Sequence, residues 1–221
     1  MKKSVSEVCG VLALLTVVIV LSGCPSSSGG LNPDLPEGAS VEKNSSLFVT
    51  DSGSGVTSFS TNDTKYTGEY GYTLWTEGDT FYSPFTHLEV TLSKMSGNED
   101  AGYGVVFCSH DSTMLLVLIN IKKEYLIGEL DGNVFTEMQG WEESSDLLSG
   151  YNRTNVVDIS LDSGTGEFSL VFNGGSPVTF RDDEEPYHTG GRNGYIVVVS
   201  PREDFPEVPV IVTFRDNPEG L

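Results

Sequence analysis

Acidic side chains dominate the charged residues of this sequence, with 32 aspartates and glutamates against 12 lysines and arginines. Two carboxylates can hydrolyse a glycosidic bond if they lie about 5–5.5 Å apart, with retention, or about 6.5–9.5 Å apart, with inversion. The nearest approach to such a pair is Glu129 with Asp131. Because Asp131 leads into Gly132 and Asn133, which tolerate the positive φ of tight hairpins, we interpret Glu129 as a strand end and Asp131 as part of a turn. We therefore assign no catalytic residue.

Cation binding is the second kind of chemistry that acidic residues offer. A compact acidic run lies at residues 182–185, and its candidate ligands are Asp182, Asp183 and Glu184. Oxygen-rich loops suit Ca²⁺, which takes six to eight oxygen ligands. The run lacks alternating acids, however, and four consecutive acids cannot all face one ion, so a calcium site and the absence of any cofactor both stay open. The three histidines are far apart in the sequence, which argues against a zinc site.

Aromatic side chains are the usual means of binding a sugar, because a flat ring stacks on the face of a pyranose. Five aromatic residues fall in expected loops or at expected strand ends, and they are the candidate ligand-binding residues: Trp75, Tyr82, Trp141, Tyr151 and Tyr187. The alternative for each is packing in the core or at its rim, and Trp141 has the strongest case for packing.

The elements that must position these side chains are strands. Apolar and polar residues alternate in several stretches, for example from Leu88 to Leu92, and no long stretch keeps a period of 3.6 residues. The continuous apolar run from Met114 to Ile119 is typical of a strand covered on both faces. Turn signals such as Asn173-Gly174-Gly175 separate the strands. About a dozen short strands favour an all-β, antiparallel, two-sheet sandwich or jelly roll over residues 41–217.

The N-terminus has the features of a secretory signal. Lys2 and Lys3 precede an uninterrupted apolar run from Val11 to Leu21. Such a run is too short to cross a hydrocarbon core of about 30 Å, which takes roughly 20 residues, and it fits the hydrophobic region of a signal peptide.

The segment that follows, Leu21-Ser22-Gly23-Cys24, resembles the lipobox of bacterial lipoproteins. The resemblance implies that diacylglycerol is attached to Cys24 and that residues 1–23 are removed as a lipoprotein signal peptide. The alternative is an ordinary signal peptide that contains a cysteine. With Cys24 acylated, Cys108 alone remains and cannot form an internal disulfide, so the core must stabilise the fold.

Residues 24–40 combine the lipidated cysteine with a flexible tether, because the stretch after Cys24 has almost no apolar content. Pro25, rather than aspartate, follows Cys24, as in outer-membrane lipoproteins. We therefore expect an exported protein, anchored by its lipid to the bacterial membrane at the outer membrane or cell surface. The formal net charge of −20 argues against nucleic acid as a partner.

The order of strand and turn signatures over residues 82–215 resembles the concanavalin A-like jelly roll, in the branch that includes laminin G-like domains of bacterial surface proteins. The signatures are, in order, Gly102–Phe107, Leu115–Asn120, Glu124–Glu129, Trp141 with Ser144 and Ser145, Asn155–Val157, Phe172–Gly175, Gly190–Gly194 and Val210–Phe214. The resemblance implies a two-sheet sandwich in which a curved sheet or its edge loops often bind a carbohydrate or protein ligand. Laminarinase-type members of this fold carry Glu-x-Asp-x-Glu along one strand, and the third acid is missing here.

The leading hypothesis is a surface-tethered, non-catalytic binding module of the bacterial cell envelope, with a glycan or protein ligand. One alternative is an envelope glycoside hydrolase of the same fold. Another is a structural lipoprotein without a small-molecule ligand. A groove lined by aromatic residues with polar neighbours would favour the binding module. Paired carboxylates inside such a groove would favour the hydrolase. A sandwich without an aromatic groove would favour the structural protein.

Overall fold

The computed structural model describes residues 40–182 and 188–217. The expected signal peptide, the lipidated Cys24 and the expected tether up to residue 39 lie outside this part of the chain, as do Asp183, Glu184 and Tyr187. Within the described ranges, no helix is both long enough and apolar enough to cross a membrane.

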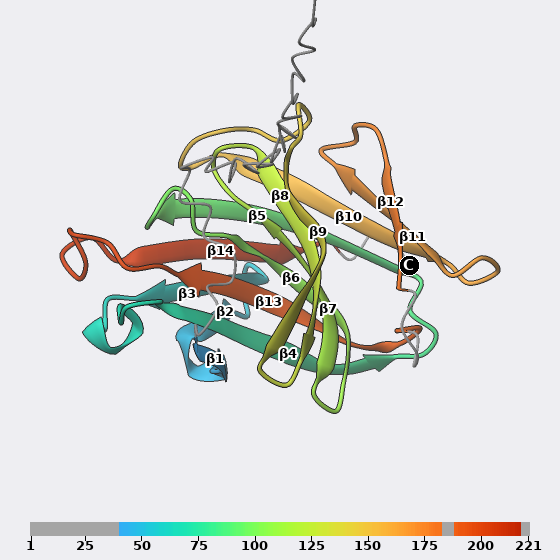
Figure 1. Cartoon of the computed structure of the whole chain (residues 1–221), viewed down its shortest axis with the longest axis horizontal. Coiled ribbons are helices and arrows are strands. Elements are labelled where there is room, and N and C mark those ends of the chain that lie inside the picture. The colour runs from blue at the N-terminus through green and yellow to red at the C-terminus, as the bar shows by residue number, and fades with distance from the viewer. Residues whose placement is uncertain (1–39, 183–187, 218–221) are drawn as a thin grey trace, which may run out of the picture. The chain divides into compact units, whose positions relative to one another are not determined.

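Fourteen strands and two short 3₁₀ helices form the described part of the chain (Figure 1). In chain order they are β1 (Ser40–Lys43), η1 (Ser45–Leu47), β2 (Phe48–Asp51), β3 (Val56–Thr61), η2 (Thr64–Tyr66), β4 (Tyr72–Tyr82), β5 (His87–Ser96), β6 (Tyr103–His110), β7 (Thr113–Ile119), β8 (Glu124–Asp131), β9 (Val134–Glu143), β10 (Thr154–Asp162), β11 (Glu167–Phe172), β12 (Val178–Arg181), β13 (Gly191–Val199) and β14 (Val210–Asp216).

The strands form two sheets of seven. Sheet A has the order β1-β4-β13-β6-β7-β8-β9, and sheet B has the order β12-β11-β10-β5-β14-β3-β2. All neighbouring strands are antiparallel except β1 and β4, which are parallel. The last strand, β14, lies between β3 and β5, so the C-terminal end of the domain completes the middle of sheet B. The predicted two-sheet antiparallel sandwich is confirmed, with the β1–β4 pair as its exception.

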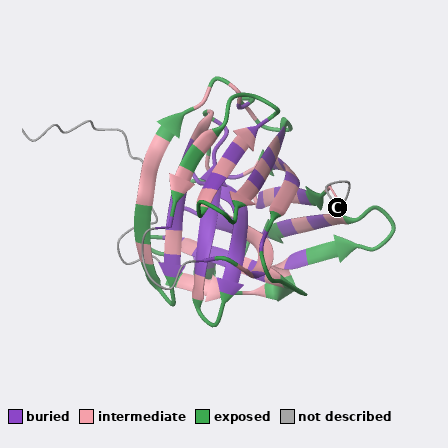
Figure 2. Ribbon diagram, turned by 90° about the vertical axis from the view of Figure 1, so that its right-hand side faces the viewer, coloured by how far each residue is buried: buried purple, intermediate pink, exposed green. Residues whose placement is uncertain are grey.

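The alternation seen in the sequence is the reason these strands form a sandwich. In β5, Val90 and Leu92 are buried in the core between the sheets. In the neighbouring β10, Val157, the register partner of Val90, and Ile159 are buried in the same core. The central strands of sheet A differ, because both of their faces are buried, and buried residues are concentrated there (Figure 2). In β7 every residue from Met114 to Ile119 is buried, which confirms the prediction of a strand covered on both sides.

Two apolar clusters therefore pack against sheet A. The larger one fills the space between the sheets and includes Phe107, Phe168 and Phe214. The smaller one lies on the other face of sheet A and includes Leu116, Leu118 and Leu126. Cys108 belongs to the larger cluster and has no exposed surface, as expected for a small buried hydrophobic residue.

Candidate functional site

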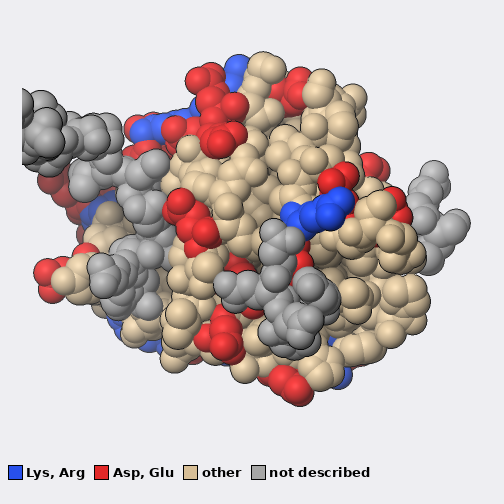
Figure 3. Space-filling view, turned by 45° about the vertical axis from the view of Figure 1, so that its right-hand side comes forward, with Lys and Arg blue, Asp and Glu red and all other residues tan. Residues whose placement is uncertain are grey.

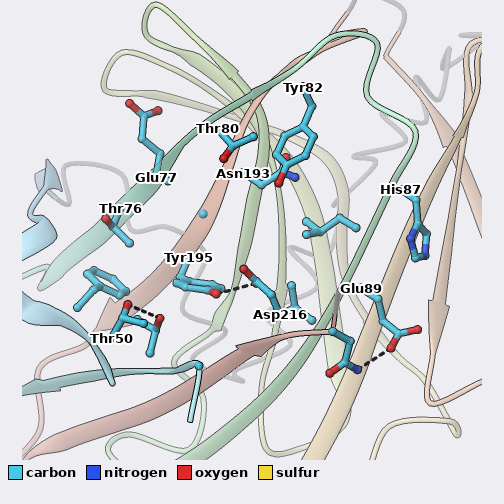
Figure 4. A pocket seen from close by; sticks show the side chains of 18 of the residues that line it. Thr50, Thr76, Glu77, Thr80, Tyr82, His87, Glu89, Asn193, Tyr195 and Asp216 are labelled. Atoms are coloured by element: carbon cyan, nitrogen blue, oxygen red, sulfur yellow. Dashed lines mark hydrogen bonds between the residues drawn. The ribbon is translucent and has the colours of Figure 1, made fainter. Parts of the chain in front are cut away.

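A pocket of about 440 Å³ lies between the two sheets, lined by β4 and β13 of sheet A and by β2, β3, β5 and β14 of sheet B (Figure 4). The two-residue period of β4 places Thr76, Thr80 and Tyr82 along the pocket. Phe81 is not part of the lining and packs against the ring of His110 instead. The end of β4 thus presents one aromatic ring to the pocket and its neighbour to another surface.

Strands β13 and β14 supply the polar wall of the pocket. The pairing of β13 with both of its neighbours shifts between Arg192 and Gly194, and this irregularity places Asn193 in the lining. Across the pocket, the hydroxyl of Tyr195 donates a hydrogen bond of 2.7 Å to Oδ1 of Asp216. Burial, and secondly the charge of Asp216, raise the pKa of Tyr195, so its hydroxyl keeps its proton and acts as the donor.

Sheet B contributes further hydrogen-bonding groups to the same pocket. Asn217 Nδ2 donates to Oε1 of Glu89 at 2.5 Å, and the hydroxyls of Thr50 and Thr57 lie 2.8 Å apart. These side chains hold one another in place before any ligand arrives, so binding would cost them little conformational entropy.

Glu77 is the carboxylate of β4 that lines the pocket, and its neighbours determine its charge. Ser109 donates a hydrogen bond to Oε2 at 2.8 Å, Lys43 donates one to Oε1, and Arg192 lies 3.8 Å away. Burial acts to raise the pKa of Glu77, but the hydrogen bonds from Lys43 and Ser109 and the two positive charges outweigh it, and the pKa is lowered. These contacts favour the ionised form of Glu77, which does not suit a general acid.

The predicted aromatic residues do not come together at one place. Tyr82 lines the pocket. Trp75 on β4 and Trp141 on β9 both pack against the apolar cluster on the far face of sheet A, and four strands lie between them. Tyr151 is partly exposed and donates its hydroxyl hydrogen bond to the carbonyl of Gly97. Tyr187 lies outside the described ranges.

Glu129 and Asp131 have different surroundings in the structure. β8 ends at Asp131 and Gly132 turns the chain with φ of 60°, as expected for a hairpin. Glu129, two residues earlier, is largely buried, and its Oε1 lies 4.0 Å from Nε2 of His188. Glu129 is therefore a largely buried strand residue beside a histidine, whereas Asp131 is an exposed residue next to a turn.

Asp182 is the one residue of the predicted calcium run that the structure describes. Its Oδ2 accepts hydrogen bonds from both the backbone nitrogen and Nδ1 of His188, at 2.8 and 2.6 Å, and both side chains are buried. This pair lines a second, smaller pocket of about 270 Å³. Because Asp183 and Glu184 are not described, the calcium site at this run stays a prediction.

Three side chains lie close enough together to hold a metal ion: His87, Glu89 and Asp158. The sequence reasoning argued against a zinc site because the three histidines are far apart, and it did not consider one histidine with carboxylates. His87 and Glu89 occupy alternate positions of one strand, and this His-x-Glu spacing was the signal available in the sequence. Asp158 comes from β10 and could not be joined to them without the strand pairing. Elsewhere the carboxylates on the face shown in Figure 3 occur in several separate groups among uncharged residues.

No protein-family model and no curated protein matches this sequence. Solved structures do match. A glycoside hydrolase family 16 enzyme of Bacteroides ovatus aligns with a TM-score of 0.56 and 9% identity over 86% of this chain and 91% of its own. The β-glucanase of Bacillus licheniformis aligns with a TM-score of 0.54 and 9% identity over 80% and 83% of the two chains.

A carbohydrate-binding module, CBM66 from Bacillus subtilis, aligns with a TM-score of 0.50 and 9% identity over 76% of this chain and 87% of its own. At these identities the likeness shows the fold and not the activity. Together with the two seven-stranded sheets, it shows that the chain has the concanavalin-like jelly-roll fold that the sequence signatures resemble.

Proposed function

We propose that this protein is a non-catalytic module of the bacterial cell envelope that binds a glycan in the polar pocket between the two sheets. The observation that carries the proposal is the lining of that pocket. It combines the aromatic ring of Tyr82 with hydroxyl, amide and carboxylate groups, among them Asn193, Tyr195 and Asp216. A sugar offers several hydroxyls, each a donor and an acceptor, together with an apolar ring face, so it suits a wall of this composition.

The pocket volume and the fold agree with a small saccharide. A volume of about 440 Å³ falls within the range of roughly 300–1,000 Å³ typical of small-molecule sites. Proteins of the same fold include a module described as carbohydrate-binding and a hydrolase solved with a G4G4G3G product. These relationships support a glycan as the ligand class.

Binding is favoured over hydrolysis by the state of the acidic residues. A glycosidase needs one protonated carboxylic acid beside a second carboxylate. Among the described residues, three carboxylates line the pocket, and each accepts a hydrogen bond from the protein: Glu77 from Lys43 and Ser109, Asp216 from Tyr195 and Glu89 from Asn217. These contacts favour the ionised form of Glu77, whose pKa is lowered. Glu129 lies beside the buried His188 instead of in the larger pocket.

A lipid tether at Cys24 supports the envelope location. The tether rests on the lipobox resemblance, and it is tested separately from the pocket. In cells fed radiolabelled palmitate, we expect label on the wild-type protein and none on Cys24→Ser, with the wild type in the membrane fraction. Label that persists in Cys24→Ser would contradict lipidation at this residue.

A glycan array and pull-downs on insoluble polysaccharides, done with the full chain, test the pocket. We expect Tyr82→Ala to lower affinity for the bound glycan about tenfold or more, because stacking of the ring is lost. Phe81→Ala is the matched control, since Phe81 is the adjacent residue, has similar exposure and lies outside the pocket. Equal losses in the two variants, or no glycan bound above background by the wild type, would contradict the proposal.

A further inference from the structure

Three metal-ligating side chains gather where β5 and β10 lie side by side in sheet B. His87 and Glu89 alternate along β5, and Asp158 is the register partner of Glu89 on β10. Their neighbours Leu88, Val90, Val157 and Ile159 point into the core, so the three side chains project from the opposite face of the sheet. The pairing of two strands therefore builds the cluster, and no loop is needed to hold it.

The distances suit a shared ion. One ligand atom from each residue lies within 4.8 Å of the other two, and Nε2 of His87 lies 2.9 Å from Oδ1 of Asp158. Ligand atoms bound about 2.0–2.2 Å from one zinc ion lie roughly 3–4 Å from each other. Small side-chain rotations would bring all three atoms into this range.

The protein neutralises the negative charges of Glu89 and Asp158 only in part. Glu89 and Asp158 are directly opposed across the strands, and opposed like charges destabilise a sheet. Among the residues that the structure describes, no lysine or arginine forms an ion pair with either carboxylate, and His87 is the one basic group beside them. A divalent cation would neutralise both carboxylates and leave His87 as a neutral ligand.

One ligand is already oriented and the cluster is open to solvent. Asn217 holds Oε1 of Glu89, which leaves Oε2 free to coordinate. The side chains of His87 and Asp158 are 29% and 36% exposed. An ion bound here would keep one or more positions for water or an oxygen of a ligand.

We propose that His87, Glu89 and Asp158 form a binding site for a divalent transition-metal ion of the zinc type. One imidazole nitrogen with two carboxylates suits Zn²⁺, whereas Ca²⁺ prefers ligand sets made of oxygen alone. The site goes beyond the glycan proposal and does not depend on it, since the strand pairing provides the ligands whether or not the pocket holds a sugar.

Calorimetric titration of the metal-stripped full chain with ZnCl₂ tests the site. Cys9 and Cys24 are replaced by Ser in every protein compared, so that the thiols of the N-terminal segment do not bind zinc. We expect one ion per chain, with affinity lowered about tenfold or more in His87→Ala and in Asp158→Asn. His110→Ala is the matched control and should bind as the parent does, because His110 is exposed and paired with Asp111 away from the cluster.

Two further readouts separate metal binding from effects on folding. Zn²⁺ should raise the melting temperature of the parent and of His110→Ala but not that of His87→Ala, while all three have the same circular dichroism spectrum without metal. CaCl₂ should produce no comparable shift. Unchanged zinc affinity in His87→Ala, or binding of Ca²⁺ in preference to Zn²⁺, would overturn the proposal. Loss of glycan binding in Tyr82→Ala with intact zinc binding would show that the two sites are independent.

Discussion

The hydroxyl of Tyr195 on β13 donates a hydrogen bond of 2.7 Å to Asp216 at the end of β14, and so connects sheet A to sheet B across the pocket. The ring of Tyr195 also stacks on Phe214, with 4.4 Å between ring centroids. One residue thus joins the apolar core to the polar wall of the candidate site.

Tyr195→Phe should lower the free energy of unfolding by about 1 kcal/mol, because it removes a donor to a carboxylate and keeps the stacked ring. Urea denaturation checks this. Tyr70→Phe is the control, since Tyr70 is well exposed, and should change stability by less than about 0.5 kcal/mol. A double-mutant cycle with Asp216→Asn should show coupling between the two positions, and additive effects would contradict a direct contribution of this hydrogen bond.

Gly104→Ala should destabilise the domain by about 3 kcal/mol or more. Gly104 is on β6, paired with β13 on one side and β7 on the other, and a Cβ there would lie 1.9 Å from the carbonyl oxygen of Val117. Backbone on a central strand cannot move aside without disrupting the pairing. Gly68→Ala is the matched control, because a Cβ at Gly68 meets open space, and thermal unfolding compares the two. Similar melting temperatures for both variants would show that the backbone of β7 does not approach Gly104 as closely as the structure indicates.

Lys94 should make stability depend on pH. Its side chain is fully buried, with Nζ donating to the carbonyls of Asn98 and Ala101, and burial, followed by the charge of Arg202, lowers its pKa to about 7. In the unfolded chain the pKa returns to about 10.5, so above pH 7 the unfolded state holds a proton that the folded state has lost. The unfolded state then binds more protons, and stability rises with pH.

The rise expected from Lys94 is about 1–2 kcal/mol between pH 7 and about pH 8.5. Urea denaturation across this range measures it as the difference between wild type and Lys94→Met, which lacks the titrating amine. Lys122→Met is the control and should keep the wild-type slope, because Lys122 is exposed and its hydrogen bond with Asp100 raises its pKa. A slope that survives in Lys94→Met would assign the effect to another group.

Cys108 should be inert in the folded protein. It has no exposed surface, and burial, followed by the charge of Asp182, raises its pKa to about 12, so almost no thiolate forms near neutral pH. With Cys9 and Cys24 replaced by Ser, a thiol-specific dye at about pH 8 should label the chain only after guanidinium is added. Ser112→Cys places a thiol at an exposed turn in the same background and should react at once. Rapid labelling of Cys108 without denaturant would mean that this part of the core opens readily.

The fold was predictable because its signals are local. Alternation along β5, β10 and β11, the continuous apolar run of β7 and the glycine at the β8–β9 turn each depend on a few adjacent residues. Lys94 was also detectable, since it extends the inward positions of Val90 and Leu92, and a charged residue at such a position predicts a buried lysine. The parallel pairing of β1 with β4 carries no comparable local signal.

The candidate site was only partly predictable. Tyr82 was identified as a sugar-binding candidate and does line the pocket, but Trp75 and Trp141 pack on the far face of sheet A. Their residue types suit both roles, so residue type alone could not separate a binding aromatic from a packing one. Asn193 was missed because its position depends on an irregular stretch of β13 pairing.

The sequence by itself indicated most of the strands from β5 onward, which of their faces are apolar, and where the chain turns, because backbone sterics and two-residue periodicity act between near neighbours. Only the tertiary structure decided which polar side chains meet. Asp216 reaches Tyr195 because β14 lies opposite β13 in the sandwich, and Asp158 reaches His87 across 71 residues of sequence because β10 pairs with β5. Contacts between residues so far apart in the sequence depend on strand order and register, and these are set by the packing of the whole core.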